Sequence, residues 1–433
     1  MLVCLNGKWK IPIGYFLQAK STAAIQASLV TTAITMANDI GLCVRAVTCD
    51  GTSTNISTIS KLGCQMSGVY SEIIEYFTIP GVEQKIYYIP DACHNLKLAR
   101  NALATYQVFK TNDNCEINWK HIQNLHKAQK NIGLNLANKL TATHLDWKKN
   151  IMKVKLAAQI LSSSIADALE FFQNLKDPNF INCKETIHFI RAIDRLFDFL
   201  NTRNPFGKGF KKPLYKGSIE NMKNIILPII EYLLSLTDVK GLPLYLTPRK
   251  TFLIGFAIAV KSVFAMAEDL FNSNLNYNYL LTYKCSQDHL EILFSKIRQR
   301  LGNNNNPNVV ELKTSLKKML LKNAISSSYA ANCMAFDNTS ESIFEIRWRK
   351  KFKDLLNTDS SEESLSSISL FQSFEGQDFD VVKDNILYYI CGFIVKNLIK
   401  KIDCSTCTDN LLENNFNEHN YNHKYKYSML IDV

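Results

Sequence analysis

The sequence lacks the features of several large protein classes. No apolar run reaches the ~20 residues that span a bilayer, since the longest, near 225–236 and 252–267, are interrupted by polar groups. No basic segment followed by an apolar one marks a secretory signal at the start. The 12 cysteines form no dense disulfide framework. No Gly-x-x-x-x-Gly-Lys-Ser/Thr loop occurs, which excludes a P-loop site. We therefore expect no membrane contact and a reducing compartment, the nucleus or cytoplasm.

The first residues also differ from a typical N-terminus, because they have the pattern of a hairpin inside a fold. Val3–Leu5 is apolar, Asn6 and Gly7 are typical of a hairpin turn, and Trp9–Leu17 is apolar again. This pattern is typical of the middle of a fold. We therefore expect that further sequence precedes these residues.

Positive charge exceeds negative charge, with a formal net charge of +11. The excess is concentrated in a Gly/Pro-containing loop and around Trp348, in two groups: Lys208, Lys211, Lys212 and Lys216; and Arg347, Arg349, Lys350, Lys351 and Lys353. Contacts with DNA phosphates would release counterions and make the affinity steeply salt-dependent. Short charge runs are also common on solvated helix faces, so both interpretations stay open.

Residues 1–106 alternate strand and helix signals after the opening hairpin. Apolar residues recur at helical spacing in Thr22–Ile40, and a short β-branched strand, Val44–Thr48, ends at Asp50. The order continues with a helix, a strand and a helix, at Ser53–Gly63, Lys85–Ile89 and Asp91–Tyr106. Such an order predicts a mixed α/β core.

Three further regions follow. Residues 107–262 show helical periodicity without strand alternation, which predicts an all-helical insertion. Residues 263–310 comprise two helical stretches that end at an asparagine-rich turn. Residues 311–433 are expected to hold a basic helix, an acidic Ser-rich linker, an apolar helix at 386–402 and a disordered tail.

Acidic residues at element ends are the first candidates for chemistry. Asp50 stands at the carboxyl end of a strand, where α/β crevices open, although such an Asp is also common in turns. Asp91 begins a helix that carries His94, either as a functional group or as a cap on a solvated surface helix. Asp288 and Glu291 are three residues apart on one helix, so their carboxylates are neighbours. Metal-assisted phosphoryl transfer needs such carboxylates, yet this spacing is also typical of capping pairs.

One cysteine pair is a candidate for zinc. Cys404 and Cys407 form a single C-x-x-C motif, and His419 and His423 follow in the tail. Zinc would need two further ligands, so free cysteines and a zinc site both stay open.

Several segments together resemble the P-element transposase family, including its THAP-domain relatives in animals. They are LNGKWKIPIGYFL (5–17), VTCDGTSTN (47–55), DACHNLKLARNAL (91–103), MKVKLAAQILSSSIADALEF (152–171), FDFLNTRNP (197–205) and LTYKCSQDHLEILFSKIRQRLGNNNNP (281–307). The last segment is the most specific, and the resemblance covers about residues 1–310.

The resemblance implies a ribonuclease-H-like core with a triad of acidic residues, interrupted by a helical insertion that binds GTP for assembly on DNA. Asp50 matches the second acidic residue and Glu291 the third, and both would hold Mg²⁺ or Mn²⁺. Asp288 and Lys153 resemble nucleotide-contacting residues, and Asp198 resembles the aspartate that recognises the base. A carboxylate that accepts two guanine N–H donors would select GTP over ATP. DNA as the substrate, a homo-oligomer and a nuclear location are also implied.

The family's first Asp and its zinc-containing DNA-binding domain would lie upstream of Met1. A triad without one carboxylate should lower nuclease activity by about 10³-fold or more, so the 433 residues alone are expected to be inactive as a nuclease. One alternative is a domesticated, catalytically dead protein that binds DNA or nucleotide. Another is the hAT class of transposases, which also has a split ribonuclease-H-like fold but not these segments.

Overall fold

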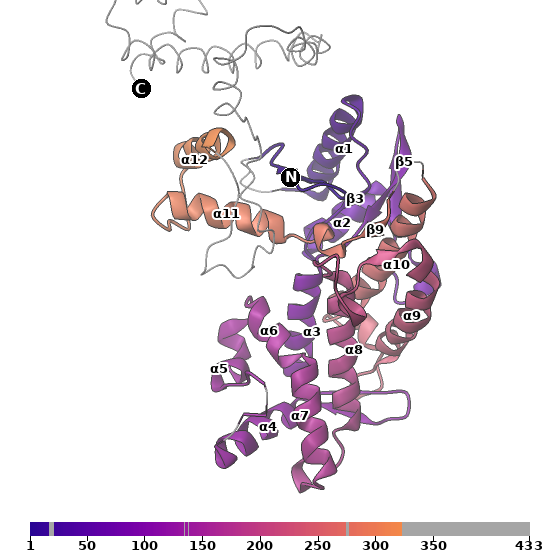
Figure 1. The fold of residues 1–433 in the computed structure, drawn as a ribbon, viewed down its shortest axis with the longest axis vertical. Coiled ribbons are helices and arrows are strands. Elements are labelled where there is room, and N and C mark those ends of the chain that lie inside the picture. Colours follow the sequence, from indigo (N-terminus) through magenta and orange to yellow (C-terminus); the bar gives the residue numbers. More distant parts are fainter. Residues whose placement is uncertain (17–20, 134, 137, 274–276, 323–433) are drawn as a thin grey trace, which may run out of the picture. The chain divides into compact units, whose positions relative to one another are not determined.

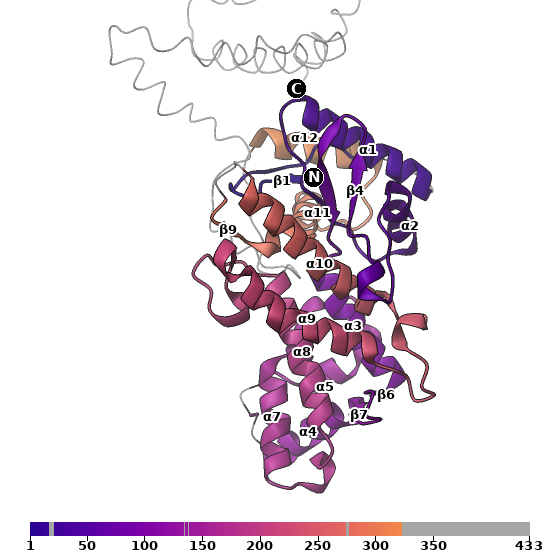
Figure 2. The same cartoon turned by 90° about the vertical axis from the view of Figure 1, so that its right-hand side faces the viewer.

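The computed structural model describes residues 1–322 except 17–20, 134, 137 and 274–276 (Figures 1 and 2). Some predictions concern later residues: the basic group around Trp348, the acidic linker, the helix at 386–402, and Cys404 with Cys407. These lie outside the described residues.

The N-terminal residues form two small sheets. β1 (Leu2–Val3) and β2 (Lys10–Ile11) pair as the predicted antiparallel hairpin. β3 (Ala46–Val47), β4 (Tyr76–Ile79) and β5 (Val82–Tyr88) form the second sheet in the order β3-β5-β4, with β3 parallel and β4 antiparallel to β5. β4 was not predicted from the sequence. Its turn into β5 contains Gly81 at a φ of +81°, a conformation that glycine adopts without steric cost.

The helices predicted in the core are confirmed. α1 (Ala23–Asp39) and α2 (Ser53–Leu62) pack against each other, and the Thr58 hydroxyl donates a hydrogen bond to Gln26 Oε1 at 2.9 Å. α3 (Ala92–Tyr106) starts after Asp91, whose side chain accepts a hydrogen bond from His94 N. The predicted helix-capping role of Asp91 is therefore correct.

The interpretation of α3 as a solvated surface helix is wrong. α3 packs against α6, α8 and α10, and even its polar residues are buried: Lys97 is 6% exposed, Asn101 3% and Arg100 0%. Charged residues at this spacing look like a surface in the sequence because burial of a cation is rare. α3 is the element that leads from the sheet into the insertion (Figure 1).

The insertion is mainly helical but not all-helical. β6 (Val108–Lys110) and β7 (Glu116–Asn118) form an antiparallel hairpin at its start. Strands of three residues are too short to show alternation, which explains why the pattern did not predict them. The helices are α4 (Trp119–Ile132), α5 (Ala142–Leu145), α6 (Val154–Ile160), α7 (Ser163–Asn174), α8 (Lys184–Leu200) and α9 (Ile219–Ser235).

α10 (Thr251–Asn272) is the most apolar long helix of the described part. By length and composition it could cross a membrane, yet 78% of its most apolar window is buried inside the protein, as in a core helix. It packs against β5, α3, α8 and α9. Gly255 permits the contact with α3, since a Cβ there would lie 2.4 Å from Asn95 Oδ1. The domain boundary predicted at residue 262 falls inside α10, which runs through it without a break.

The chain then returns towards the sheet. β9 (Tyr279–Leu280) pairs with β8 (Leu214–Tyr215), and a 3-10 turn, η7 (Thr282–Cys285), leads into α11 (Asp288–Arg300). α12 (Val309–Lys322) packs on α11 through a small separate core: Ile292, Leu293, Ile297, Leu316 and Met319. This core fixes the apolar side of α11, whereas Asp288 in its first turn contacts Cys93 of α3 and Arg203, which follows α8.

Candidate functional site

Two aspartates follow neighbouring parallel strands. Asp50 stands three residues after β3 and Asp91 three residues after β5. Backbone pairing continues beyond the strands, since Asp91 N donates to Cys49 O at 3.2 Å. Asp50 and Asp91 therefore reach the same edge of the sheet, the carboxyl edge at which α/β proteins bind ligands.

Asp50 is oriented by the start of α2. Its Oδ1 accepts hydrogen bonds from Thr52 N at 3.1 Å and from Asn55 Nδ2 at 2.7 Å. No described residue donates a hydrogen bond to its Oδ2. The next residue, Gly51, has no room for a side chain, because a Cβ would lie 2.7 Å from Thr251 Cγ2 and 3.6 Å from the His94 ring. The chain after Asp50 is thus held tightly against α3 and α10.

Asp91 joins α3 to α11. One carboxylate oxygen accepts from His94 N at 2.8 Å and the other from Gln287 N at 3.0 Å, so a single side chain caps two helices. Asp91 is 3% exposed, and burial raises its pKa to about 6, with smaller contributions from the charges of Asp288 and Glu291. Asp91 is better explained as the junction of these helices than as a surface cap.

The first turn of α11 carries the two acidic residues that the sequence singles out. Asp288 is buried and forms an ion pair with Arg203 at 2.5 Å, while Cys93 Sγ donates to its other oxygen at 3.5 Å. Glu291 lies about one turn further along α11 and is partly exposed. The two neighbours therefore differ in surroundings: Asp288 is buried in contact with Arg203 and Cys93, whereas Glu291 is partly exposed.

His94 lies near both predicted catalytic residues. Burial, and to a smaller extent Lys97, lowers the pKa of His94, whereas the negative charges of Asp50 and Glu291 raise it. Both carboxylates therefore act on the same imidazole. The structure brings Asp50 and Glu291 into one region although they are far apart in the chain.

The end of α8 is fastened to the segment that enters α11. Thr202 N donates to Thr282 Oγ1 at 3.0 Å, Tyr283 N donates to Thr202 O at 3.2 Å, and Thr282 Oγ1 donates to Phe199 O at 2.6 Å. The Arg203–Asp288 ion pair adds a fourth link. The insertion and the acidic helix are therefore connected by a buried network. Arg203 was not predicted as a site residue, because its partner Asp288 is 85 residues away in the sequence.

The residues predicted to contact a nucleotide lie on different elements. Asp198, near the end of α8, has a side chain 24% exposed, and burial and Asp194 raise its pKa to about 6 while Lys211, at 3.6 Å, opposes this. Lys153 is exposed and precedes α6 as its N-cap. The hydrogen bonds at the end of α8 connect the helix that carries Asp198 to the segment that carries Asp288. Lys153 is connected to α3 instead, through the loop that precedes it.

Arg100 of α3 makes this connection, and it was also not predicted from the sequence. Its fully buried guanidinium donates to the carbonyls of Asn150 at 3.0 Å and Ile151 at 3.1 Å, and Lys153 N in turn donates to Asn150 O. Burial lowers the pKa of Arg100 to about 10. The loop before Lys153 is thus anchored to the helix that begins at Asp91.

A metal site is only partly present in the described residues. Among them, no three His, Cys, Asp or Glu side chains are grouped closely enough to hold a metal ion. Asp50 has one oxygen without a donor, as a metal ligand requires, and Glu291 lies in the same region. Two carboxylates fit as ligands, but two-metal chemistry needs more than two. The described residues therefore do not complete such a site.

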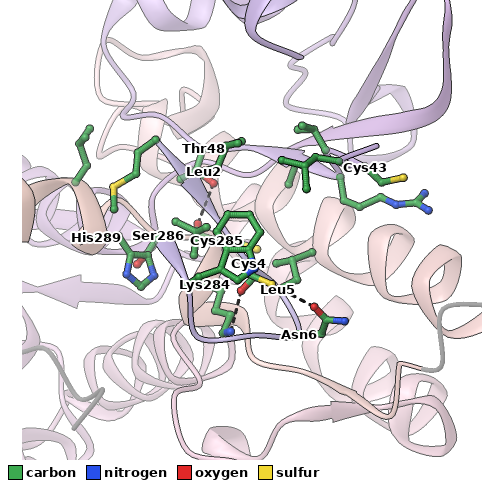
Figure 3. Close-up of a pocket in the computed structure, with 18 of the residues that line it drawn as sticks. Leu2, Cys4, Leu5, Asn6, Cys43, Thr48, Lys284, Cys285, Ser286 and His289 are labelled. Atoms are coloured by element: carbon green, nitrogen blue, oxygen red, sulfur yellow. Dashed lines mark hydrogen bonds between the residues drawn. The ribbon is translucent and has the colours of Figure 1, made fainter. Parts of the chain in front are cut away.

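A cavity of about 410 Å³ is lined by Thr48, two residues before Asp50, and by Ser286, which precedes α11 (Figure 3). Both β1 and β3 line it, and among the described strands each pairs on one side only, so each keeps an open edge. Lys284 Nζ donates to Cys4 O at 2.8 Å, and Thr48 Oγ1 donates to Cys285 O at 3.1 Å. These bonds connect both sides of the cavity to η7, the turn that precedes α11. The cavity thus lies between two sheets, each with a free edge towards it among the described strands.

A mixed sheet with carboxylates at its edge, an acidic late helix and a helical insertion define a ribonuclease-H-like core split by an insertion domain. Family models match each part: TNP-like, RNase H N-terminal domain at residues 1–63; TNP-like, GTP-binding insertion domain at 93–213; and TNP-like, RNase H C-terminal domain at 283–317. A fourth, the C-terminal domain of DNA transposase THAP9, matches residues 378–431, beyond the resemblance recognised in the sequence. The chain belongs to the P-element transposase family.

Individual relatives agree with this assignment. The chain is 31% identical to DNA transposase THAP9 of Homo sapiens over 373 residues, which cover 86% of this chain and 37% of that protein. It is 23% identical to Transposable element P transposase of Drosophila melanogaster, covering 79% of this chain and 45% of that one. The chain therefore spans less than half the length of either relative. The fold resembles the Drosophila P element transposase strand transfer complex, with a TM-score of 0.62 and 23% identity over 72% of this chain and 67% of that chain.

Proposed function

We propose that this chain is the core of a P-element-like DNA transposase that binds GTP in its insertion and processes DNA in the nucleus with Mg²⁺ or Mn²⁺. The observation that carries the proposal is the buried connection between the insertion and α11. α11 bears Glu291, and its neighbour Asp288 is bound by Arg203 at the end of α8. A nucleotide held by α8 would therefore act on the helix that carries an acidic residue of the site.

The roles of the residues follow from their surroundings. Asp50 and Glu291 are proposed as two metal ligands, and Mg²⁺, when bound, would polarise the scissile phosphate. Lys153 is proposed to contact the nucleotide phosphates, and Asp198 the guanine N–H donors. Asp288 is proposed to act on the nucleotide site through Arg203, because its own carboxylate is only 4% exposed.

A third carboxylate would have to come from outside the described residues. We propose that it arrives on a strand that fills the cavity between β1 and β3, since both strands present free edges to it. A polypeptide of these 433 residues alone is then expected not to cut DNA. Addition of a preceding acidic strand should restore Mg²⁺-dependent cleavage, and failure to do so would favour a catalytically dead protein that binds DNA or nucleotide.

GTP binding tests the proposal directly. Calorimetric titration of the 433-residue chain should show binding of GTP and not of ATP. Lys153→Ala should weaken binding by about tenfold or more, as expected for the loss of a charged hydrogen bond. Lys155→Ala is the matched control, because Lys155 is also exposed and lies two residues further along. Equal affinities for GTP and ATP, or no binding by the folded chain, would contradict the proposal.

The pKa of Asp198 gives a second test. Only the ionised carboxylate can accept both guanine donors, and the pKa of Asp198 is raised to about 6. GTP affinity should therefore fall as the pH drops through about 6 and should be steady above it. Asp198→Asn should abolish this pH dependence and reduce the preference for GTP over ATP.

A further inference from the structure

The loop that follows α8 displays an aromatic side chain in an unusual way. Phe206 is 88% exposed, the highest value for a large apolar side chain among the described residues. It belongs to residues 204–212, called here the 204–212 loop. Isolated exposed apolar residues are common, so exposure alone assigns no role. The surroundings of Phe206 are what distinguish it.

The backbone of the 204–212 loop is firmly held. Phe206 N donates to Asn204 Oδ1 at 2.9 Å, Tyr215 OH donates to Pro205 O at 3.2 Å, and Thr202 Oγ1 donates to Phe210 O at 3.5 Å. Gly207 has no room for a side chain, because a Cβ there would lie 1.9 Å from Lys211 O. The exposed ring is thus presented by an ordered turn, which lowers the entropy lost when a ligand covers it.

The same loop carries three lysines. Lys208, Lys211 and Lys212 are all exposed. Lys211 pairs with Asp198 at 3.6 Å and Lys212 lies 5.5 Å from the centre of the Tyr215 ring. Within the described residues Lys208, two positions after Phe206, has no acidic partner. An exposed aromatic ring in a lysine-rich loop is typical of contacts with single-stranded nucleic acid, in which bases stack on the ring and cations contact the phosphates.

The loop lies close to the proposed cleavage site. Arg203 immediately precedes it and binds Asp288, which is one helical turn from Glu291. A DNA end processed at Glu291 would therefore lie beside the loop. Bases inside a duplex are stacked on each other and offer no free face, whereas an unpaired base does.

We infer that Phe206 stacks on an unpaired DNA base next to the cleavage site, while Lys208 contacts the adjoining phosphate. The inference rests on the proposed function in DNA processing. It adds a ligand, an unpaired DNA base, and the residue that recognises it, Phe206. Phe206 would hold a frayed or single-stranded DNA end, and the lysines would supply affinity that is independent of sequence.

Fluorescence anisotropy with three DNAs tests this inference on the 433-residue chain: a blunt duplex, the same duplex with a single-stranded overhang, and the single strand. Phe206→Ala should weaken binding of the overhang and the single strand by about tenfold and change the blunt duplex less than about twofold. Phe206→Trp should preserve binding, since it keeps a flat aromatic face. Lys208→Ala should weaken all three DNAs and lower the salt slope by about one.

Leu246→Ala is the control, because Leu246 is 60% exposed, lies in the insertion and has no aromatic face. Equal weakening of all three DNAs by Phe206→Ala, or no weakening, would overturn the inference and leave the proposed function intact. If the wild-type chain bound none of the three DNAs, both the inference and the proposed function would be overturned.

Discussion

Two ion pairs at the end of α8 lie in very different surroundings. Arg203 and Asp288 connect the insertion to α11 with side chains 20% and 4% exposed, whereas in the second pair Lys211 is 69% exposed and Asp198 is 24% exposed. A buried pair becomes costly when one partner is lost, because the other charge stays uncompensated. An exposed pair can be lost at little cost. The buried junction should therefore determine stability and coupling, and the exposed loop should determine binding.

The largest effect is expected from the buried pair. Arg203→Ala should lower the free energy of unfolding by about 3 kcal/mol, since it leaves Asp288 buried without its cation. A double-mutant cycle with Asp288→Ala, measured by urea denaturation, should give a coupling energy of about 2 kcal/mol or more. A coupling below about 0.5 kcal/mol would show that this pair resembles an exposed one.

Asp91, which caps both α3 and α11, is a second buried contact whose loss should be costly. Asp91→Ala removes the acceptors of His94 N and Gln287 N together and should cost about 2 kcal/mol. The control is Thr22→Ala, which removes a single cap on α1, with a bond of 3.3 Å. If both substitutions cost the same, Asp91 would be an ordinary cap and not a junction.

The pH dependence of stability should also reflect the buried junction. The pKa of Asp91 in the folded chain, about 6, exceeds its ordinary value of 3.8, so folding favours the protonated form. The stabilisation is complete below about pH 4 and is lost as the pH rises through about 6, by an amount on the order of 3 kcal/mol. Denaturation between pH 4 and pH 7 should show this decline in the wild type. Asp91→Asn should not show it, and a parallel decline in both would exclude Asp91 as its source.

The smallest effect is expected from the exposed pair. Lys211→Ala should change the free energy of unfolding by about 0.5 kcal/mol or less, because Lys211 is well solvated. A cycle with Asp198→Ala checks the coupling by the same urea method. A value comparable to that of Arg203 and Asp288 would remove the distinction between the two regions.

The sequence predicts those features that depend on local patterns. Helical spacing predicts α1 and α2, and the Asp-Gly turn after a β-branched strand predicts the place of Asp50. Asp91 is predicted as a helix cap because capping depends on the next three residues only. Short elements such as β4 and the β6–β7 hairpin carry too few residues for a pattern, so they are not predicted.

The connections between distant segments cannot be predicted in this way. Arg100 and Arg203 look like surface cations, and only the fold places them against backbone carbonyls and against Asp288. The second bond of Asp91, from Gln287, is equally non-local. The resemblance to the family supplies Asp50, Asp288 and Glu291 as candidates, but not the links that join them. Those links arise from tertiary packing, which no local spacing specifies.

We expect nucleotide bound in the insertion to act on α11 through the end of α8. Hydrogen exchange of the amides in the first turns of α11, measured with and without saturating GTP, tests this coupling. Exchange should be slower with GTP in the wild-type chain and should not change in Arg203→Ala, under conditions where that variant is folded and binds GTP. Unchanged exchange in a wild-type chain that is saturated with GTP would contradict it.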